Sequence, residues 1–205
     1  METNVAQRTI PIMIGGNEMP PKLKFTREQI IEAALNVTKK NGISGLTARA
    51  VATELESSAK PIFGLFQNME EVKYEVVKAA NEIYQSYLQN EMAAGEYLPY
   101  KASGMAYIKF AKEETELFKL LFMRDRTNEV IEENREELRP ILKLLMDNLN
   151  ISEDEAYIMH MELWIYVHGI ATMLATSYLD WDVEFISDTL TDAYEGLKSR
   201  HIGGK

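Results

Sequence analysis

Signals that start helices constrain this chain more than any other feature of its sequence. At several points a polar capping residue is followed three positions later by Glu or Gln, a pattern that gives unpaired backbone N–H groups side-chain partners. Apolar residues at helical spacing follow these signals, whereas no stretch alternates as a half-buried strand would. The sequence therefore predicts an all-α protein. The clearest pairs are Thr26 with Gln29, Asn68 with Glu71, and Ser152 with Glu155.

Turn residues between these signals set the expected ends of the helices. The first predicted helix ends at Asn41-Gly42, because glycine adopts the left-handed conformation at little cost. Thr47 and Ser58 are the expected caps of two short helices, and Pro140 is expected to interrupt a later one. The predicted ranges are 27–41, 48–55, 59–65, 69–92, 102–123, 132–149, 153–178 and 183–200.

Composition narrows the class of protein. There is no cysteine, which excludes disulfides, cysteine-ligated metals and cysteine nucleophiles. No apolar run approaches the length of a membrane helix, and the N-terminus lacks the pattern of a secretory signal. We therefore expect a cytoplasmic protein that does not enter membranes.

Charge is distributed unevenly along the chain. The net charge is −10, which by itself disfavours binding to nucleic acid. Residues 19–68, however, hold seven basic and four acidic side chains, a net charge of +3, whereas residues 69–205 carry −12. This asymmetry suggests two functional regions, although a modest excess over fifty residues also arises by chance.

The two short helices near the N-terminus are arranged as in a helix-turn-helix. In the second, Ile62 and Phe66 are predicted to be buried, which leaves the opposite face free to enter a DNA major groove. Lys60 could reach a phosphate or a guanine edge, and Gly64 would allow the backbone to approach closely. A short helical corner with no DNA partner would show the same periodicity.

The candidate DNA-binding residues come from the helix caps, this outer face and the basic segment before it. Hydroxyl and free N–H groups at helix caps are good partners for phosphate. The candidates are Lys22, Lys24, Arg27, Thr47, Arg49, Ser58, Ala59, Lys60, Pro61, Phe63 and Gly64.

Several spaced motifs within residues 25–75 together resemble the DNA-binding domain of the TetR family. The motifs are the runs 25–35, 41–42, 46–52, 58–66 and 68–72. Further on, the segment 106–118 resembles the start of that family's ligand-binding domain. Trp164, His168 and Gly169 resemble the Trp–His–Gly signature of one subset of the family.

The resemblance implies a function as well as a fold. It implies a homodimer joined through the last two helices of each chain, and a repressor that binds a pseudo-palindromic operator in double-stranded DNA. A small molecule would release the repressor from its operator. The implied organisation is a disordered extension over 1–18, a DNA-binding domain over 19–75, and a ligand-binding and dimerisation domain over 76–205.

Three positions depart from the family's usual pattern. Phe63 and Met69 stand where many members have Tyr and Lys that contact phosphate, so a hydroxyl and a charge are lost. Glu56 replaces a frequent glycine in the turn and adds a negative charge near the expected DNA surface. These departures predict weaker backbone contacts or greater reliance on the basic segment at Lys22, Lys24 and Arg27.

The resemblance implies an effector cavity in the second region, and the aromatic and methionine side chains that are frequent there would suit an apolar or amphipathic effector. The same residues would also make a solid core, and for Trp164 and His168 we favour packing over direct ligand contact. The candidates are Met105, Tyr107, Phe110, Phe118, Phe122, Tyr157, Met161, Trp164 and His168.

Neither a metal nor an enzymatic cofactor is expected. His160 and His168 lie eight residues apart without a second cluster of ligands. No nucleophile elbow, phosphate-binding loop or dinucleotide fingerprint occurs. Two alternatives to a regulator stay open, namely a helical adaptor that binds a protein partner instead of DNA, and a small α-helical enzyme.

Overall fold

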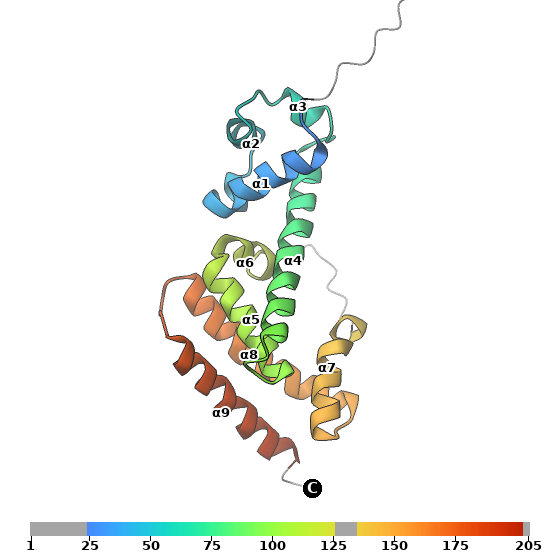
Figure 1. The fold of residues 1–205 in the computed structure, drawn as a ribbon, viewed down its shortest axis with the longest axis vertical. Helices are drawn as coiled ribbons and strands as arrows, with labels where there is room; N and C mark the ends of the chain where they lie inside the picture. Colours follow the sequence, from blue (N-terminus) through green and yellow to red (C-terminus); the bar gives the residue numbers. More distant parts are fainter. Residues whose placement is uncertain (1–23, 126–134, 203–205) are drawn as a thin grey trace, which may run out of the picture.

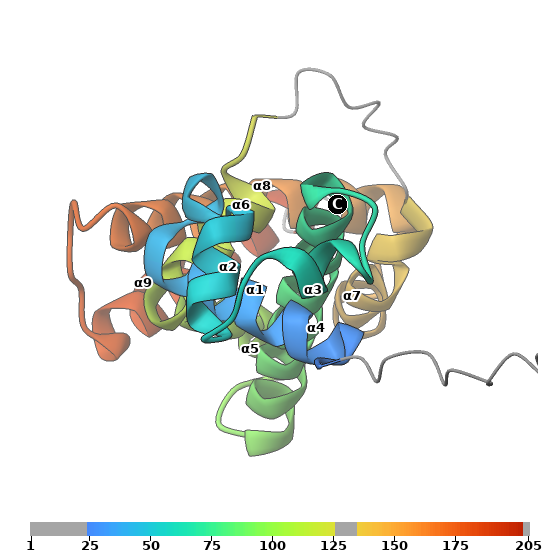
Figure 2. The ribbon, with the colours of Figure 1, turned by 90° about the horizontal axis from the view of Figure 1, so that it is seen from above.

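The computed structural model describes residues 24–125 and 135–202, and this part of the chain forms helices and no strand. Figure 1 shows α1, α2 and α3 gathered at one end, with α4 running from that end along the other helices. Figure 2 shows the molecule from above, with α1, α2 and α3 in front of α5 and α8. The helices are α1 (Arg27–Asn41), α2 (Ala48–Glu54), α3 (Lys60–Phe63), α4 (Met69–Ala94), α5 (Pro99–Glu113), α6 (Thr115–Phe122), α7 (Arg135–Leu149), α8 (Glu153–Ala175) and α9 (Val183–Ile202), with a short 3-10 helix η1 (Ile43–Gly45).

The expected fold class is confirmed, and so are the capping interactions on which it was based. Thr26 accepts a hydrogen bond from the Gln29 backbone N–H at 3.2 Å, and the Gln29 side chain accepts one from the Thr26 N–H at 2.9 Å. Ser152 and Glu155 form the same reciprocal pair at the start of α8. Asn68 caps α4 by accepting from the N–H of Glu71. The predicted extension 1–18 and Lys22 lie outside the described residues.

Three expectations about helix boundaries are wrong. Ser58 does not cap α3, because Ala59 occupies the N-cap position and Pro61, which needs no N–H partner there, lies in the first turn. The predicted helix over 102–123 is divided at Glu114, whose backbone leaves the helical region with φ −119° and ψ 50°. Pro140 lies inside α7 without ending it, near an exposed first turn where water can satisfy a freed carbonyl.

The buried side chains form two clusters. The larger one joins α1–α4 to α5, α6, α8 and α9, and its fully buried members include Ile30, Val76 and Phe118. The smaller one lies between α7 and α8 around Leu142 and Met159. α5 packs against both α4 and α8 and is the central helix of the second region.

α4 connects the two regions without a break. The predicted domain boundary after residue 75 falls inside this 26-residue helix, and its first half packs on α1 while its second half packs on α5. One continuous helix therefore belongs to both regions. None of the described helices has both the length and the apolar character that crossing a membrane requires.

Candidate nucleic-acid interface and aromatic cluster

α3 is anchored by two buried side chains and presents the rest of its surface to solvent. Ile62 and Phe66 are 0% and 2% exposed, as the sequence predicts. On the other side, Lys60 and Gly64 are exposed, and the ring of Phe63 is 51% exposed. Ala59 and Pro61 are half-buried at the start of the helix. The candidates on α3 therefore lie together, with apolar and basic groups side by side.

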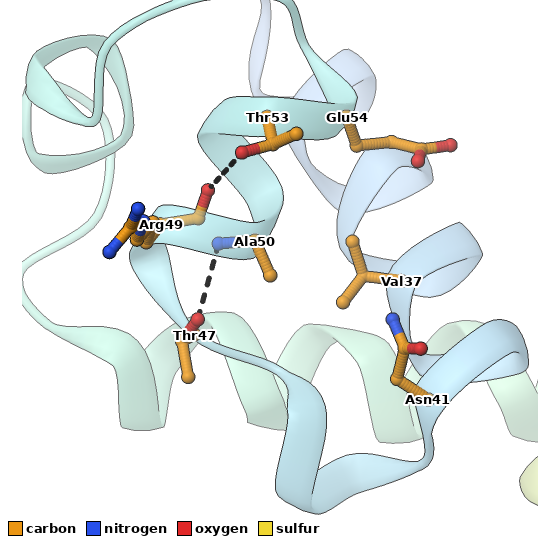
Figure 3. A pocket seen from close by; sticks show the side chains of 7 residues that line it. All are labelled: Val37, Asn41, Thr47, Arg49, Ala50, Thr53 and Glu54. Carbon is orange, nitrogen blue, oxygen red and sulfur yellow. Dashed lines mark hydrogen bonds between the residues drawn. The ribbon is translucent and has the colours of Figure 1, made fainter.

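α2 contributes a second group of candidates beside a surface hollow. Thr47 caps α2 by accepting a hydrogen bond from the N–H of Ala50 at 3.1 Å. Arg49 is exposed, and Figure 3 shows its side chain pointing away from Glu54 on the opposite side of the hollow. The lining residues of this hollow are Val37, Asn41, Thr47, Arg49, Ala50, Thr53 and Glu54.

The turn between α2 and α3 has a strained residue. Glu56 has φ of 47°, a left-handed conformation that glycine adopts more readily than residues with a Cβ atom. Glycine has no Cβ atom, so a glycine at this position would adopt the same conformation at a lower cost.

Replacing Glu56 with glycine should therefore raise the free energy of unfolding by about 0.5–1 kcal/mol. Urea denaturation followed by circular dichroism would measure this change. Ser58→Gly is a matched control in the same loop, because Ser58 does not have a positive φ and should gain nothing. Equal stabilisation, or none, in both variants would contradict the assigned strain.

Arg27 is engaged in contacts within the protein, although the sequence places it among the DNA-binding candidates. Its guanidinium donates to the carboxylates of Glu71 and Glu75, each at 2.8 Å, and to the Leu65 carbonyl at 3.0 Å. It also stacks over the Phe66 ring, with Cζ 4.1 Å from the centroid. Hydrogen bonds to Glu75 and then Glu71 raise the pKa of Arg27. Arg27 thus holds α1 and the segment that follows α3 to α4.

Other basic residues of the first region also have protein partners. Lys24 donates to Ser57 at 3.2 Å, Lys39 pairs with Glu114 of the second region at 2.6 Å, and Lys40 pairs with Glu54 at 2.8 Å. By contrast, the side chains of Arg49 and Lys60 form no hydrogen bond or ion pair with the rest of the described chain. These two cations are available to phosphate.

Six of the predicted effector-binding residues meet in one aromatic cluster between α4, α5, α6 and α8. The rings of Tyr107 and Phe122 have centroids 4.8 Å apart, and Phe118 lies 5.3 Å from Tyr107. Trp164 stacks on His168 with centroids 4.7 Å apart. The side chains contact one another and fill the space between the helices. The cluster consists of Tyr84, Tyr107, Phe110, Phe118, Phe122, Trp164 and His168.

The other three effector-binding candidates lie elsewhere. Met105 is buried in the larger core, Met161 is half-buried on α8, and Tyr157 packs on the α7–α8 cluster. The Arg135 guanidinium lies over the Tyr157 ring at 4.2 Å from its centroid.

Two tyrosine–histidine hydrogen bonds connect α5 to α8. Tyr107 and His168 Nδ1 are 2.9 Å apart, and the same distance separates Tyr100 from His160 Nδ1. Burial lowers the pKa of both histidines, which favours neutral rings at neutral pH. These pairs account for both histidines without a metal, and the described residues contain no group of ligands that could hold one.

The sequence analysis missed Tyr84, Tyr100 and His160 as members of these contacts. Tyr100 and Tyr107 are seven residues apart on α5, and His160 and His168 are eight apart on α8. Both spacings place side chains on one helix face about two turns apart, so a comparison of the two helices could have suggested the pairing.

The second region matches a known family. Residues 100–194 match the model of the family described as the Tetracyclin repressor-like, C-terminal domain. A search of curated proteins found no match.

Solved structures share the fold over most of the chain. A TetR-like transcriptional regulator from Rhodococcus sp. RHA1 has a TM-score of 0.59 at 14% identity, with 87% of this chain and 96% of that chain covered. A TetR-family member from Streptomyces coelicolor A3 has a TM-score of 0.55 at 19% identity, covering 82% and 96%. The multidrug binding protein EbrR, complexed with imidazole, has a TM-score of 0.56 at 20% identity, covering 87% and 95%. Residues 100–194 are therefore a Tetracyclin repressor-like C-terminal domain, and most of the chain shares the fold of the solved TetR-like proteins.

Proposed function

We propose that this chain is a homodimeric transcriptional repressor that binds a pseudo-palindromic operator through α3 and leaves it when a small molecule binds. The observation that carries this proposal is the surface of α3. Two buried side chains fix the helix in place while Lys60, Phe63 and Gly64 face solvent at one end of the molecule. A short exposed helix held in this way can enter a major groove about 12 Å wide.

Phosphate binding in this proposal relies on a small number of groups. Residues 24–75 hold seven basic and seven acidic side chains, so this region is neutral overall. Arg49, Lys60 and the capped N-terminus of α2 are the groups that face solvent there and favour an anion. Two copies of this surface would double the phosphate contacts and read two half-sites about 34–36 Å apart.

Exposed apolar side chains on α8 and at the start of α9 support a dimer. Ile165 is 66% exposed and Val183 is 61% exposed, and Ile158, Tyr166 and Phe185 are about half exposed. A Cβ atom added to Gly169 on α8 would meet no described atom outside the helix's own nearby backbone within 4 Å, which leaves room for a second copy. A second copy that covers this surface would remove apolar area from water, which favours association.

The aromatic cluster supports a small effector of apolar or amphipathic character. One structural neighbour is described as a multidrug binding protein in complex with imidazole, and this chain has an aromatic cluster in its own second region. The rings are in contact, so an effector must separate them to enter. Tyr84 belongs to α4, and its ring centroid is 5.3 Å from those of Phe110 and Phe122, so their separation would act directly on α4.

The effector can shift the protein only by binding one conformation better than the other. α4 would carry the change to the first region, where Arg27 joins α4 to α1 and to the segment that follows α3. The separation between the two α3 helices of a dimer would then no longer match the half-site spacing.

Selection from a random-sequence duplex library with the purified full chain tests the proposal. We expect a pseudo-palindromic site, bound at least about 1000-fold more tightly than a scrambled duplex in fluorescence anisotropy. Affinity should fall steeply as salt rises, because phosphate contacts release counterions. If the selection enriches no sequence and the chain instead binds a protein partner with an affinity that does not depend on salt, the chain is a helical adaptor and not a DNA-binding regulator.

A further inference from the structure

The outer surface of α3 has an unusual chemistry for a helix that reads DNA. From residue 59 to residue 66 the sequence is AKPIFGLF, and Lys60 is the one residue in it whose side chain can form a hydrogen bond. Among the side chains that read bases through paired hydrogen bonds, namely Arg, Lys, Asn and Gln, this segment contains Lys60 alone. Most of the base-contacting surface of α3 is therefore apolar.

Phe63 is the largest apolar group on that surface. Its ring is 51% exposed, while the neighbouring Ile62 and Phe66 are buried, so Phe63 is not needed to fill the core. Gly64 follows it and adds no side chain that would keep the ring away from a groove. A ring in this position gains by contact with an apolar partner.

The floor of the major groove offers one such apolar group among the four bases. Thymine carries a 5-methyl group at its major-groove edge, whereas the other bases present hydrogen-bond donors and acceptors there. An aromatic ring that approaches this edge can bury the methyl group but cannot satisfy polar groups of another base.

We infer that Phe63 recognises the 5-methyl group of a thymine in each operator half-site. This inference rests on the proposed function and names how the same surface selects its DNA. Lys60, one residue after the N-cap of α3, supplies the polar or phosphate contact, and Phe63, one turn later, supplies apolar discrimination.

The ion pairs of the first region strengthen this assignment. Arg27, Lys39 and Lys40 are each paired with a glutamate within the protein, so few cations are left to attract phosphate. Apolar contact with the bases therefore contributes a larger share of the affinity than it would in a strongly basic domain.

Deoxyuridine provides the test, because it pairs as thymine does and lacks only the methyl group. Each thymine of the selected operator is replaced in turn, symmetrically in both half-sites, and Kd is measured by fluorescence anisotropy. At one thymine position, the loss of each methyl group should weaken the affinity of the wild-type protein about 4-fold. Replacement in both half-sites should therefore weaken it about 15-fold. Phe63→Ala should bind the thymine and deoxyuridine duplexes equally.

Leu98→Ala is the matched control. Leu98 is an exposed apolar residue, 73% exposed, between α4 and α5 and far from α3, so this variant should keep the full 15-fold ratio. Measurements at low salt keep the affinity of Phe63→Ala within range, because phosphate contacts strengthen there. Circular dichroism should show the same melting temperature for Phe63→Ala and the wild type, since the ring is exposed.

Three results would overturn the inference. If no deoxyuridine substitution weakens selective binding, the operator is read without the methyl group and the proposed function still stands. If Phe63→Ala keeps the wild-type ratio, another residue contacts the methyl group and Phe63 lies against the sugar–phosphate backbone. If the wild-type protein shows no sequence preference at all, the proposed function fails together with the inference.

Discussion

Replacing Ile165 with arginine should convert the proposed homodimer into a monomer and weaken operator binding at least about 100-fold. Ile165 is 66% exposed in the single chain, so the substitution leaves the core of the protomer intact. In a symmetric dimer each surface meets its own copy, so two introduced charges would be brought together and removed from water. The monomer would bind one half-site of the operator, whereas the dimer binds two.

Size-exclusion chromatography with light scattering measures the mass of the variant, and fluorescence anisotropy measures its affinity for the selected operator. Leu98→Arg is the control, because it places the same charge on an equally exposed apolar residue that lies between α4 and α5. This control should remain a dimer with wild-type affinity. A dimeric Ile165→Arg protein with unchanged affinity would show that the α8 surface is not the interface.

Local sequence signals predicted most of the helical architecture. The caps at Thr26, Thr47, Asn68 and Ser152 all occur in the structure, because each is an interaction within three residues of the helix start. Such interactions depend on nothing distant in the chain. The expected burial of Ile62 and Phe66 is likewise observed, since the spacing of apolar residues on a short helix determines which side faces the core.

Helix boundaries without a strong local signal could not be predicted in the same way. Glu114 divides α5 from α6 although neither glycine nor proline occurs there, and its carboxylate is paired with Lys39, 75 residues earlier in the chain. That tertiary contact is not visible in the local sequence. At the start of α3 the N-cap position is occupied by Ala59, whose side chain cannot accept a hydrogen bond. The local sequence predicts instead that the neighbouring Ser58 caps the helix, because serine is a common N-cap residue.

In the candidate site, too, features set by the local sequence could be predicted, whereas features set by contacts with distant residues could not. The exposure of Lys60 and Phe63 follows from helix periodicity. The role of Arg27 does not, because its partners Glu71 and Glu75 are 44 and 48 residues away. A basic residue before a helix-turn-helix resembles a phosphate contact until the carboxylates that neutralise it are located.

Changing Lys60 to glutamate should weaken operator binding at least about 100-fold while leaving the dimer intact. Lys60 is exposed at the first turn of α3 and has no partner within the described chain, so its removal breaks no contact in the fold. The variant loses one cation per protomer and places a carboxylate against phosphate or the electronegative edge of guanine. The loss should exceed that of Lys60→Gln, because repulsion is added to the missing attraction.

Anisotropy across a salt series separates this electrostatic effect from a general loss of structure. The slope of log K against log salt should become shallower by about 2 for the dimer, since each phosphate contact contributes about 0.9. Lys143→Glu is the control, because it makes the same charge change at an exposed site on α7 and should preserve affinity and slope. Wild-type affinity in the Lys60→Glu dimer would mean that α3 does not enter the groove. The thymine contact assigned to Phe63 would then fail too, since the two side chains project from the same short helix.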